Sequence, residues 1–120
     1  MAKIMIVDDM ASMRKMVSFT LESVGHEVMQ ADDGDVALGI AQENTFDLVI
    51  TDVNMPNMDG ITLTKELRGI PSFKFTPILL LTTESAKDKK MSGKAAGATG
   101  WLVKPFDPDK LLATIKRVLG

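Results

Sequence analysis

The chain has 120 residues, of which 45% are hydrophobic and 25% are charged, so it suits a single domain with its own core and is too short for two. It has no cysteine and one histidine, which excludes disulfides, thiol nucleophiles and multi-histidine metal centres. Its 14 basic and 16 acidic residues give a net charge of −2, which argues against a general nucleic-acid binder. There is no membrane-length apolar run and no signal peptide, so we expect a cytoplasmic protein.

The first half of the chain alternates apolar runs with helical periodicity. Residues 3–7 (Lys-Ile-Met-Ile-Val) form a short apolar run without alternation of polar and apolar residues, which indicates a strand covered on both faces. A helix with apolar residues at helical spacing follows and ends at Gly25, a left-handed cap. A weaker strand at 28–31, a second helix and a strand at 48–51 come next. The expected stripes are Met13, Met16, Val17, Thr20, Leu21 and Val24 in the first helix, and Val36, Ala37, Ile40 and Ala41 in the second.

The second half continues the pattern. A short helix with Leu63 and Leu67 ends near Gly69, a strand covers 77–82, and a weaker edge strand covers 101–103. The fourth helix, about Ala86–Ala96, has little apolar face beyond Met91 and Ala95, so we expect it to be loosely held. The last helix begins at a first-turn proline, Pro108, and its stripe is Leu111, Leu112, Ile115, Val118 and Leu119.

Alternating strands and helices predict a single α/β domain over 1–120, with a parallel sheet and helices on both faces. All strands then end on one edge of the sheet, where ligands bind in such folds. Polar side chains follow four of these strands: they are Asp8 and Asp9, Asp52 and Asn54, Thr82 with Glu84 shortly after, and Lys104.

Each of these residues has an ordinary explanation when taken alone. Asp9 could cap a helix, Asp52 could open a turn, as Asp59-Gly60 is expected to do, and Lys104 could be a solvated lysine. Three carboxylates placed together, however, repel and raise each other's pKa unless a cation compensates. Their convergence therefore favours a functional site over a structural one.

Oxygen-only ligands without cysteine or histidine suit Mg²⁺. Lys104 would supply a second positive charge, Thr82 could donate a hydrogen bond to a phosphoryl oxygen, and one carboxylate could attack phosphorus to form an acyl phosphate. Such a set provides the positioning and charge neutralisation that phosphoryl transfer needs. The loop after the first strand has no glycine and two aspartates, which excludes a dinucleotide or flavin phosphate site. Aspartyl phosphatases of the haloacid dehalogenase type carry Asp-x-Asp, whereas this chain has Asp52-Val53-Asn54.

With these motifs in place, the sequence resembles the receiver domains of two-component response regulators over its whole length. The matching segments are Asp8-Asp9, the run from Asp52 to Gly60, Thr82 and Lys104-Pro105-Phe106. The runs 54–60 and 100–106 resemble the CheY-type chemotaxis regulators particularly closely. The resemblance implies a flavodoxin-like (CheY-like) doubly wound sheet of five strands, in the order 2-1-3-4-5.

The resemblance also implies a role for each site residue. Asp52 would accept a phosphoryl group from a CheA-like histidine kinase, Thr82 and Lys104 would contact that group, and Thr82 and Trp101 would form the conformational switch. The Mg²⁺ ligands would be Asp8, Asp9, Asp52 and the backbone carbonyl of Asn54. Asn54 and Glu84 occupy positions that tune dephosphorylation. The protein would catalyse only its own phosphorylation and slow dephosphorylation.

The protein would signal by binding a protein target, and the flagellar motor switch is one candidate. The contact surface would be formed by the fourth helix, the fifth strand and the fifth helix, and it would include Lys87, Lys90 and Trp101. We expect no nucleic-acid or membrane partner. Trp101 replaces the usual tyrosine or phenylalanine switch residue, and Lys90 stands at an apolar contact position of flagellar relatives. A phosphorelay intermediate that passes phosphate to a histidine phosphotransfer protein, and a Mg²⁺-dependent aspartyl phosphatase, stay open as alternatives. His26 is expected to face solvent.

Overall fold

The structure is a computed structural model that describes residues 1–82, 87–104 and 107–120; the side chains of residues 82 and 87–90 lie outside the described part. Its strands are β1 (Lys3–Val7), β2 (Glu27–Ala31), β3 (Leu48–Asp52), β4 (Ile78–Thr82) and β5 (Gly100–Val103). They pair in parallel in the order β2-β1-β3-β4-β5, which confirms the predicted flavodoxin-like sheet. Each predicted strand end is correct to within one residue.

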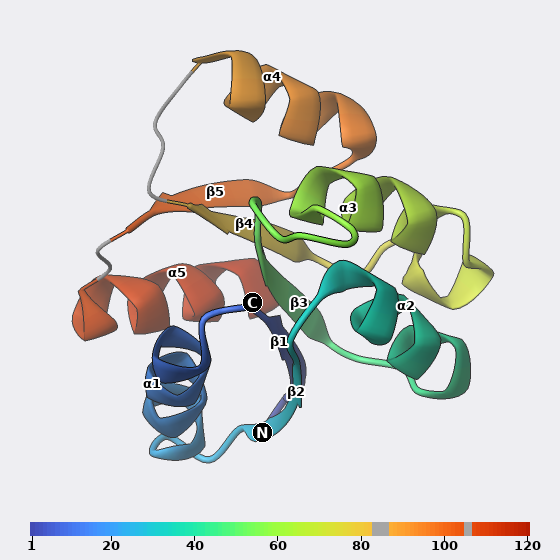
Figure 1. Ribbon diagram of the computed structural model, residues 1–120. Helices are drawn as coiled ribbons and strands as arrows, with labels where there is room; N and C mark the ends of the chain where they lie inside the picture. Colours follow the sequence, from blue (N-terminus) through green and yellow to red (C-terminus); the bar gives the residue numbers. More distant parts are fainter. Residues whose placement is uncertain (83–86, 105–106) are drawn as a thin grey trace.

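The helices cover both faces of this sheet. They are α1 (Ala11–Glu22), α2 (Gly34–Glu43), α3 (Gly60–Arg68), α4 (Lys87–Ala96) and α5 (Pro108–Leu119), with a short 3₁₀ helix η1 (Pro71–Phe73). In Figure 1, α1 and α5 lie on one side of the sheet, α2 and α3 lie on the other, and α4 lies near β5. Within the described ranges, no helix has the length and apolar character needed to span a membrane.

A hydrophobic core fills the space on each face of the sheet. Along β1, Met5 and Val7 pack with residues of α2 and α3, whereas Ile4 and Ile6 pack with residues of α1 and α5. Strands that are covered on both faces are mostly apolar, which is why β1 and β3 contain apolar runs interrupted only at their ends, by Lys3 in β1 and by Thr51 and Asp52 in β3. The edge strands β2 and β5 are partly exposed, as predicted.

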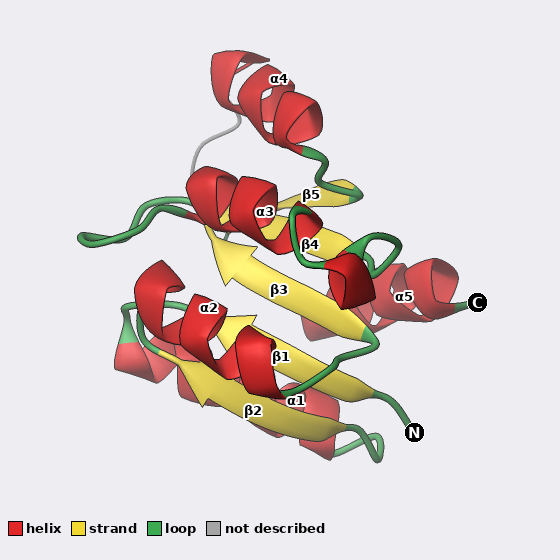
Figure 2. Ribbon diagram, turned by 90° about the vertical axis from the view of Figure 1, so that its right-hand side faces the viewer, coloured by secondary structure: helices red, strands yellow, loops and turns green. Residues whose placement is uncertain are grey.

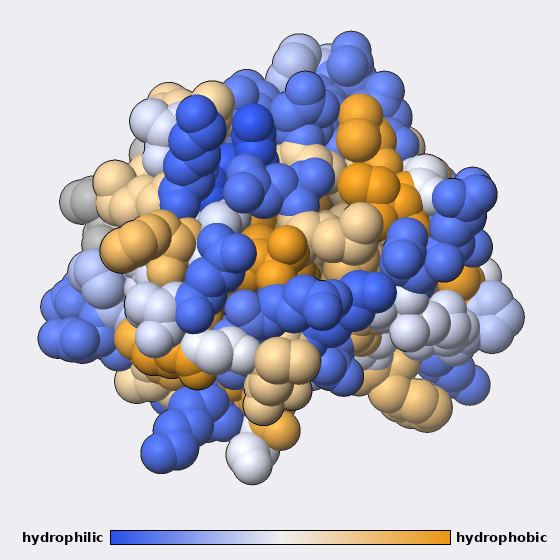
Figure 3. Space-filling model, turned by 90° about the horizontal axis from the view of Figure 1, so that it is seen from below, coloured by the Kyte–Doolittle hydropathy of each residue, from blue (hydrophilic) through white to orange (hydrophobic). Residues whose placement is uncertain are grey.

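The buried faces of α1 and α2 contain fewer residues than the apolar pattern of the sequence predicted. Val24 is 52% exposed because α1 already ends at Glu22. Gly25 closes the following turn as predicted, with φ 91° and its N–H donating to the Glu22 carbonyl at 3.0 Å. Met16 and Val36 are also exposed, because their neighbours occupy the buried line of each helix. On the face shown in Figure 3, hydrophobic side chains lie in separate spots among hydrophilic ones.

The buried side of α4 differs from the predicted one. Met91 and Ala95 are exposed, whereas Gly93 and Ala96 face the protein. A Cβ atom on Gly93 would lie 2.5 Å from Leu80 Cδ1, so this position admits no side chain without displacement. The hydropathy pattern did not predict the buried side of α4, because the small residues Gly93 and Ala96 make the contact with the rest of the protein.

The starts of α3 and α5 have clear local causes. The segment Asp59-Gly60 was expected to form a turn, but it starts α3, where Asp59 accepts hydrogen bonds from the Thr62 N–H at 2.7 Å and hydroxyl at 2.9 Å. α5 begins at Pro108, as predicted, and Asp107 caps it by accepting the Asp109 N–H at 2.9 Å.

Candidate metal and phosphoryl-transfer site at the strand ends

The predicted acidic residues come together at the edge of the sheet where the parallel strands end. The arrowheads of β1, β2 and β3 in Figure 2 point to this one side. Asp8 directly follows β1, and Asp52 is the last residue of β3. One carboxylate oxygen from each of Asp8, Asp9 and Asp52 lies within 4.8 Å of the other two. The three carboxylates therefore form a single cluster, which we call the acidic cluster.

Asp8 and Asp52 are buried and Asp9 is exposed. Asp9 does not cap α1, because the N-cap residue is Met10 and no side chain caps that helix. The Asp8 Oδ1 accepts the Met10 N–H at 2.9 Å, and Asp52 Oδ1 accepts the Val53 N–H at 2.8 Å. These bonds fix both buried carboxylates in place.

Lys104, directly after β5, brings the compensating charge. Its Nζ lies 3.0 Å from Asp8 Oδ2 and 3.4 Å from Asp52 Oδ2, and its side chain is only 8% exposed. An ammonium between two buried carboxylates offsets the repulsion that would otherwise oppose the fold. Lys104 is therefore no solvated strand-end lysine.

Together these contacts disfavour the ionised form of the Asp52 carboxyl. Burial raises the pKa of Asp52 above its ordinary value, and the Asp8 carboxylate raises it further. The Lys104 ammonium and the Val53 N–H oppose this rise without cancelling it. An additional cation near Asp52 would favour its ionised form, so the electrostatics of the cluster fit a bound metal ion.

The donor set fits one ion in particular. All three clustered side chains are carboxylates, and no histidine or cysteine belongs to the cluster. Oxygen-only ligands select Mg²⁺, Ca²⁺ or Mn²⁺, and a site with few protein ligands suits Mg²⁺, which keeps several waters. The residues present therefore fit the Mg²⁺ site predicted from the sequence.

Other predicted site residues lie around this cluster or outside the described residues. β4 and β3 pair with Asp52 opposite Leu81, so Thr82 ends the strand adjacent to Asp52; its side chain lies outside the described part, as do Glu84 and the side chains of Lys87 and Lys90. Pro105 and Phe106 lie outside it too. Asn54 is exposed in the loop after β3.

Trp101 lies half-buried on β5, beneath α4. The Cβ position of Gly93 is 3.4 Å from Trp101 Cζ3, so the indole packs against the α4 backbone. The Trp101 Nε1 is buried and has no hydrogen-bond partner among the described residues. The tryptophan is thus positioned between the sheet and α4.

Sequence reasoning missed two residues that organise this edge. Arg14 on α1 donates from Nη1 to the Asp8 carbonyl at 2.6 Å and from Nε to Gln30 Oε1 at 3.2 Å. Asp33 at the start of α2 is buried and accepts N–H groups from the loop after Asp52. Asp33 bonds backbone groups 24 and 25 residues away, and Arg14 bonds a backbone carbonyl and the side chain of Gln30, so neither contact follows a recognisable sequence motif.

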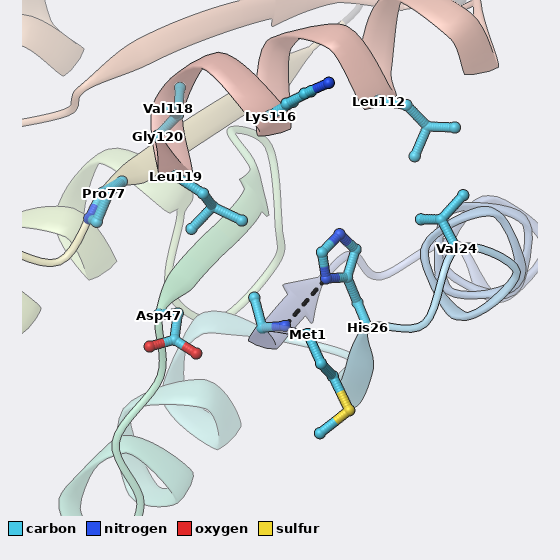
Figure 4. A pocket seen from close by; sticks show the side chains of 11 residues that line it. Met1, Val24, His26, Asp47, Pro77, Leu112, Lys116, Val118, Leu119 and Gly120 are labelled. Atoms are coloured by element: carbon cyan, nitrogen blue, oxygen red, sulfur yellow. Dashed lines mark hydrogen bonds between the residues drawn. The ribbon is translucent and has the colours of Figure 1, made fainter.

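A cavity of about 690 Å³ lies away from the acidic cluster, between α1, α5 and the start of β1 (Figure 4). Contrary to expectation, His26 is half-buried there, and its Nδ1 accepts the Ala2 N–H at 3.1 Å. The cavity walls include apolar residues such as Val24 and Leu112. Asp47 is the acidic side chain among the residues that line it, and none of the residues of the acidic cluster belongs to the lining.

Known proteins match this chain over nearly its whole length. Residues 4–116 match the family model of the response regulator receiver domain. The chain is 40% identical over 118 residues to the chemotaxis protein CheY-3 of Vibrio cholerae, covering 98% of this chain and 88% of that protein. It is 56% identical to the crystallised chemotaxis protein CheY4 of Vibrio cholerae, with a TM-score of 0.95 and 98% of each chain covered.

A third similar structure is the receiver domain of the sensor histidine kinase PA1611 from Pseudomonas aeruginosa, which has a magnesium ion coordinated in its active-site cleft. It is 27% identical, with a TM-score of 0.92, and the match covers 99% of this chain and 98% of that one. With the sheet order, the acidic cluster and the full-length matches in agreement, this chain belongs to the response regulator receiver domain family.

Proposed function

We propose that this protein is a chemotaxis-type response regulator that accepts a phosphoryl group on Asp52 in the presence of Mg²⁺ and signals through protein contacts. The observation that carries the proposal is the placement of Asp52. It is a buried carboxylate at a strand end, with Asp8 and Asp9 beside it and Lys104 Nζ 3.4 Å away. That arrangement supplies a nucleophile, a cation site and a positive charge at one point.

The chemistry follows from these groups. A carboxylate oxygen of Asp52 attacks the phosphorus of a phosphohistidine on the kinase, so a P–O bond forms and the P–N bond breaks. The imidazole leaves with the electron pair of that bond and takes up a proton. Lys104 already faces Asp52 and can pair with the phosphoryl oxygens once its bond to the carboxylate is given up. Thr82, the last residue of the adjacent strand β4, would donate a hydrogen bond to the same group.

Mg²⁺ would be held by Asp8, Asp9, Asp52 and the backbone carbonyl of Asn54, and it would neutralise charge on the phosphoryl oxygens. Receiver domains in general bind this ion, and the PA1611 receiver domain contains it in its active-site cleft. Asn54, exposed in the loop beside Asp52, and Glu84 would tune how fast water removes the phosphoryl group.

Signalling would use the surface of α4, β5 and α5. Trp101 packs against α4 through Gly93, so a pull on Thr82 at the end of β4 can be transmitted to this helix. The partners would be a CheA-like histidine kinase and a downstream protein, with the flagellar motor switch as one candidate. The relatives are named chemotaxis proteins, which supports this pathway over a phosphorelay intermediate or an aspartyl phosphatase.

The proposal is tested by intact-mass spectrometry after incubation with acetyl phosphate and Mg²⁺. We expect one added phosphoryl group in the wild type, and none in Asp52→Asn or without the metal. Asp59→Asn is the matched control, because it changes a carboxylate that only caps α3 and should leave labelling intact. No added mass in the wild type, or labelling that persists in Asp52→Asn, would refute the assignment.

A further inference from the structure

Asp33 is a buried carboxylate that the proposed chemistry does not use. It is only 4% exposed, and backbone N–H groups bind both of its oxygens. Oδ1 accepts the Gly34 N–H at 2.7 Å and the Met58 N–H at 2.8 Å, and Oδ2 accepts the Asn57 N–H at 3.1 Å. Charged side chains are almost never buried unless they are satisfied in this way.

Two of these three bonds leave the helix that Asp33 begins. As N-cap of α2, Asp33 needs only to serve N–H groups of that helix. The Asn57 and Met58 donors lie instead in the loop 53–59 between β3 and α3. Asp33 therefore bonds the start of α2 to this loop, and helix capping alone does not explain its contacts.

The neighbouring glycine brings the same two segments into contact. A Cβ atom on Gly34 would lie 2.9 Å from the Cβ atom of Met58 and would also strike the Met58 carbonyl oxygen. Only a glycine lets the loop approach this closely. Asp33 and Gly34 together hold Asn57 and Met58, and we call these four residues the Asp33 clamp.

The clamped loop is the one that starts at the phosphoacceptor. Asp52 ends β3, and Asn54 follows within the loop. The far end of the loop is also fixed, because the Gly60 N–H donates to the Val53 carbonyl at 2.9 Å and Asp59 caps α3. The Asp33 clamp fixes the middle of the loop, so it limits where the Asn54 carbonyl can lie relative to Asp52.

We propose that Asp33 is a positioning residue for the metal and phosphoryl site, which holds the loop after Asp52 so that the Asn54 carbonyl stays available to Mg²⁺. This inference rests on the proposed function. The ionisation of Asp33 agrees with it: burial alone would raise the pKa of Asp33, but the N–H groups of Met58, Asn57 and Gly34 outweigh burial and hold it below its ordinary value.

The test uses graded variants with matched controls. Asp33→Ala removes all three bonds. Asp33→Asn keeps one acceptor oxygen but places an NH₂ group, which is a donor, opposite the Asn57 N–H, so that bond is lost. Asp35→Asn makes the same change of charge at an exposed carboxylate that bonds only the Val36 N–H among the described contacts. Gly34→Ala pushes on Met58 without a change of charge, and Gly39→Ala is its control on α2, because a Cβ atom there meets nothing within 4 Å.

Two readouts separate positioning from mere stabilisation. The first is the Mg²⁺ dissociation constant from calorimetry, and the second is the rise in Tm at one fixed Mg²⁺ concentration. We expect Asp33→Ala to weaken Mg²⁺ binding by about 10-fold or more, as loss of groups behind metal ligands does. Asp33→Asn and Gly34→Ala should weaken it less, and the two control variants should bind as the wild type does.

A purely structural role would lower Tm equally with and without Mg²⁺ and leave the Mg²⁺-dependent rise unchanged. That result, with wild-type affinity in Asp33→Asn and Gly34→Ala, would overturn the inference even if Asp33→Ala fails to fold. Absence of Mg²⁺ binding by the wild type would instead refute the proposed function, so the two failures are distinguishable.

Discussion

The ammonium of Lys104 lies 3.0 Å from Asp8 Oδ2 and 3.4 Å from Asp52 Oδ2. Residues 96 positions apart in the chain thus share one buried charge contact. A lysine in this position does two things: it neutralises the two carboxylates while the site holds no phosphoryl group, and it is already directed at the atom that would receive that group.

The raised pKa of Asp52 predicts a pH-dependent cost to the fold. Between the unfolded value of about 3.9 and the raised folded value, the folded protein binds more protons at Asp52 than the unfolded chain does. The free energy of unfolding therefore falls as pH rises through this window, and the full cost is present only above the raised folded value. We expect Asp52→Asn to unfold at a higher urea concentration than the wild type at pH 7, without Mg²⁺, and the gap to shrink near pH 4.

Mg²⁺ supplies the control for this prediction. It should stabilise the wild type and leave Asp52→Asn nearly unaffected, because the variant lacks a ligand. If Asp52→Asn is less stable than the wild type at pH 7 in the absence of metal, the electrostatic description of the site is wrong.

Replacing Lys104 by methionine should destabilise the protein. The variant keeps the apolar stem but leaves Asp8 and Asp52 buried together without a cation, and loss of one partner of a buried ion pair costs about 3 kcal/mol. Urea unfolding without metal measures the loss. Mg²⁺ should restore part of it, because the ion can take over the neutralising role.

The double variant Lys104→Met/Asp52→Asn tests the cause. Removal of the second charge should recover part of the lost stability, since Asp8 then has no like charge beside it among the buried groups of the site. A double variant no more stable than Lys104→Met would show that packing, and not repulsion, sets the cost.

Ser18 on α1 offers a stabilising substitution. Its hydroxyl is buried in the face that packs on the sheet and has no hydrogen-bond partner within the described ranges. Ser18→Ala removes an unsatisfied polar atom and adds helix propensity, so we expect a gain of about 1 kcal/mol in the free energy of unfolding. Ser12→Ala, at an exposed position of the same helix, should gain only the propensity part. Equal gains in the two variants would contradict the burial argument.

Local sequence patterns sufficed for the strands and for most of the acidic edge, whereas the strand order came from the resemblance to receiver domains. The apolar run of each strand gives way to polar residues at the end of the strand, so the strand ends can be recognised in the sequence. Parallel pairing then brings those ends together at one edge of the sheet. The sequence alone therefore predicts that Asp8, Asp52 and Lys104 lie close together.

The features that the sequence did not predict depend on backbone N–H groups or on residues with little or no side chain. Asp33 binds N–H groups 24 and 25 residues away, and every residue except proline carries such a group, so the sequence gives no pattern for the contact. The buried side of α4 was misassigned because Gly93 and Ala96, and not Met91, face the protein. Hydropathy detects large apolar side chains and overlooks close approach by small ones.

The contact between Gly93 and Trp101 gives a way to follow α4 directly. Trp101 is the only tryptophan in the chain, so intrinsic fluorescence reports on this one position. A Cβ atom at Gly93 would lie 2.5 Å from Leu80 Cδ1 and 3.4 Å from Trp101 Cζ3. Leu80 is fully buried and cannot yield without disturbing the core. Gly93→Ala should therefore push α4 away from the sheet, shift the Trp101 emission to longer wavelength and speed amide hydrogen exchange in α4.

The cost of this overpacking should be about 1–3 kcal/mol, reduced by the gain of about 1 kcal/mol in helix propensity that alanine brings. Gly39→Ala has open space around its Cβ atom and should raise stability with no change in emission. If α4 is held as loosely as its small buried face suggests, its amides should exchange faster than those of α1 in the wild type as well. Unchanged emission in Gly93→Ala, with exchange in α4 as slow as in α1, would show that this helix is firmly packed and does not serve as the moving element.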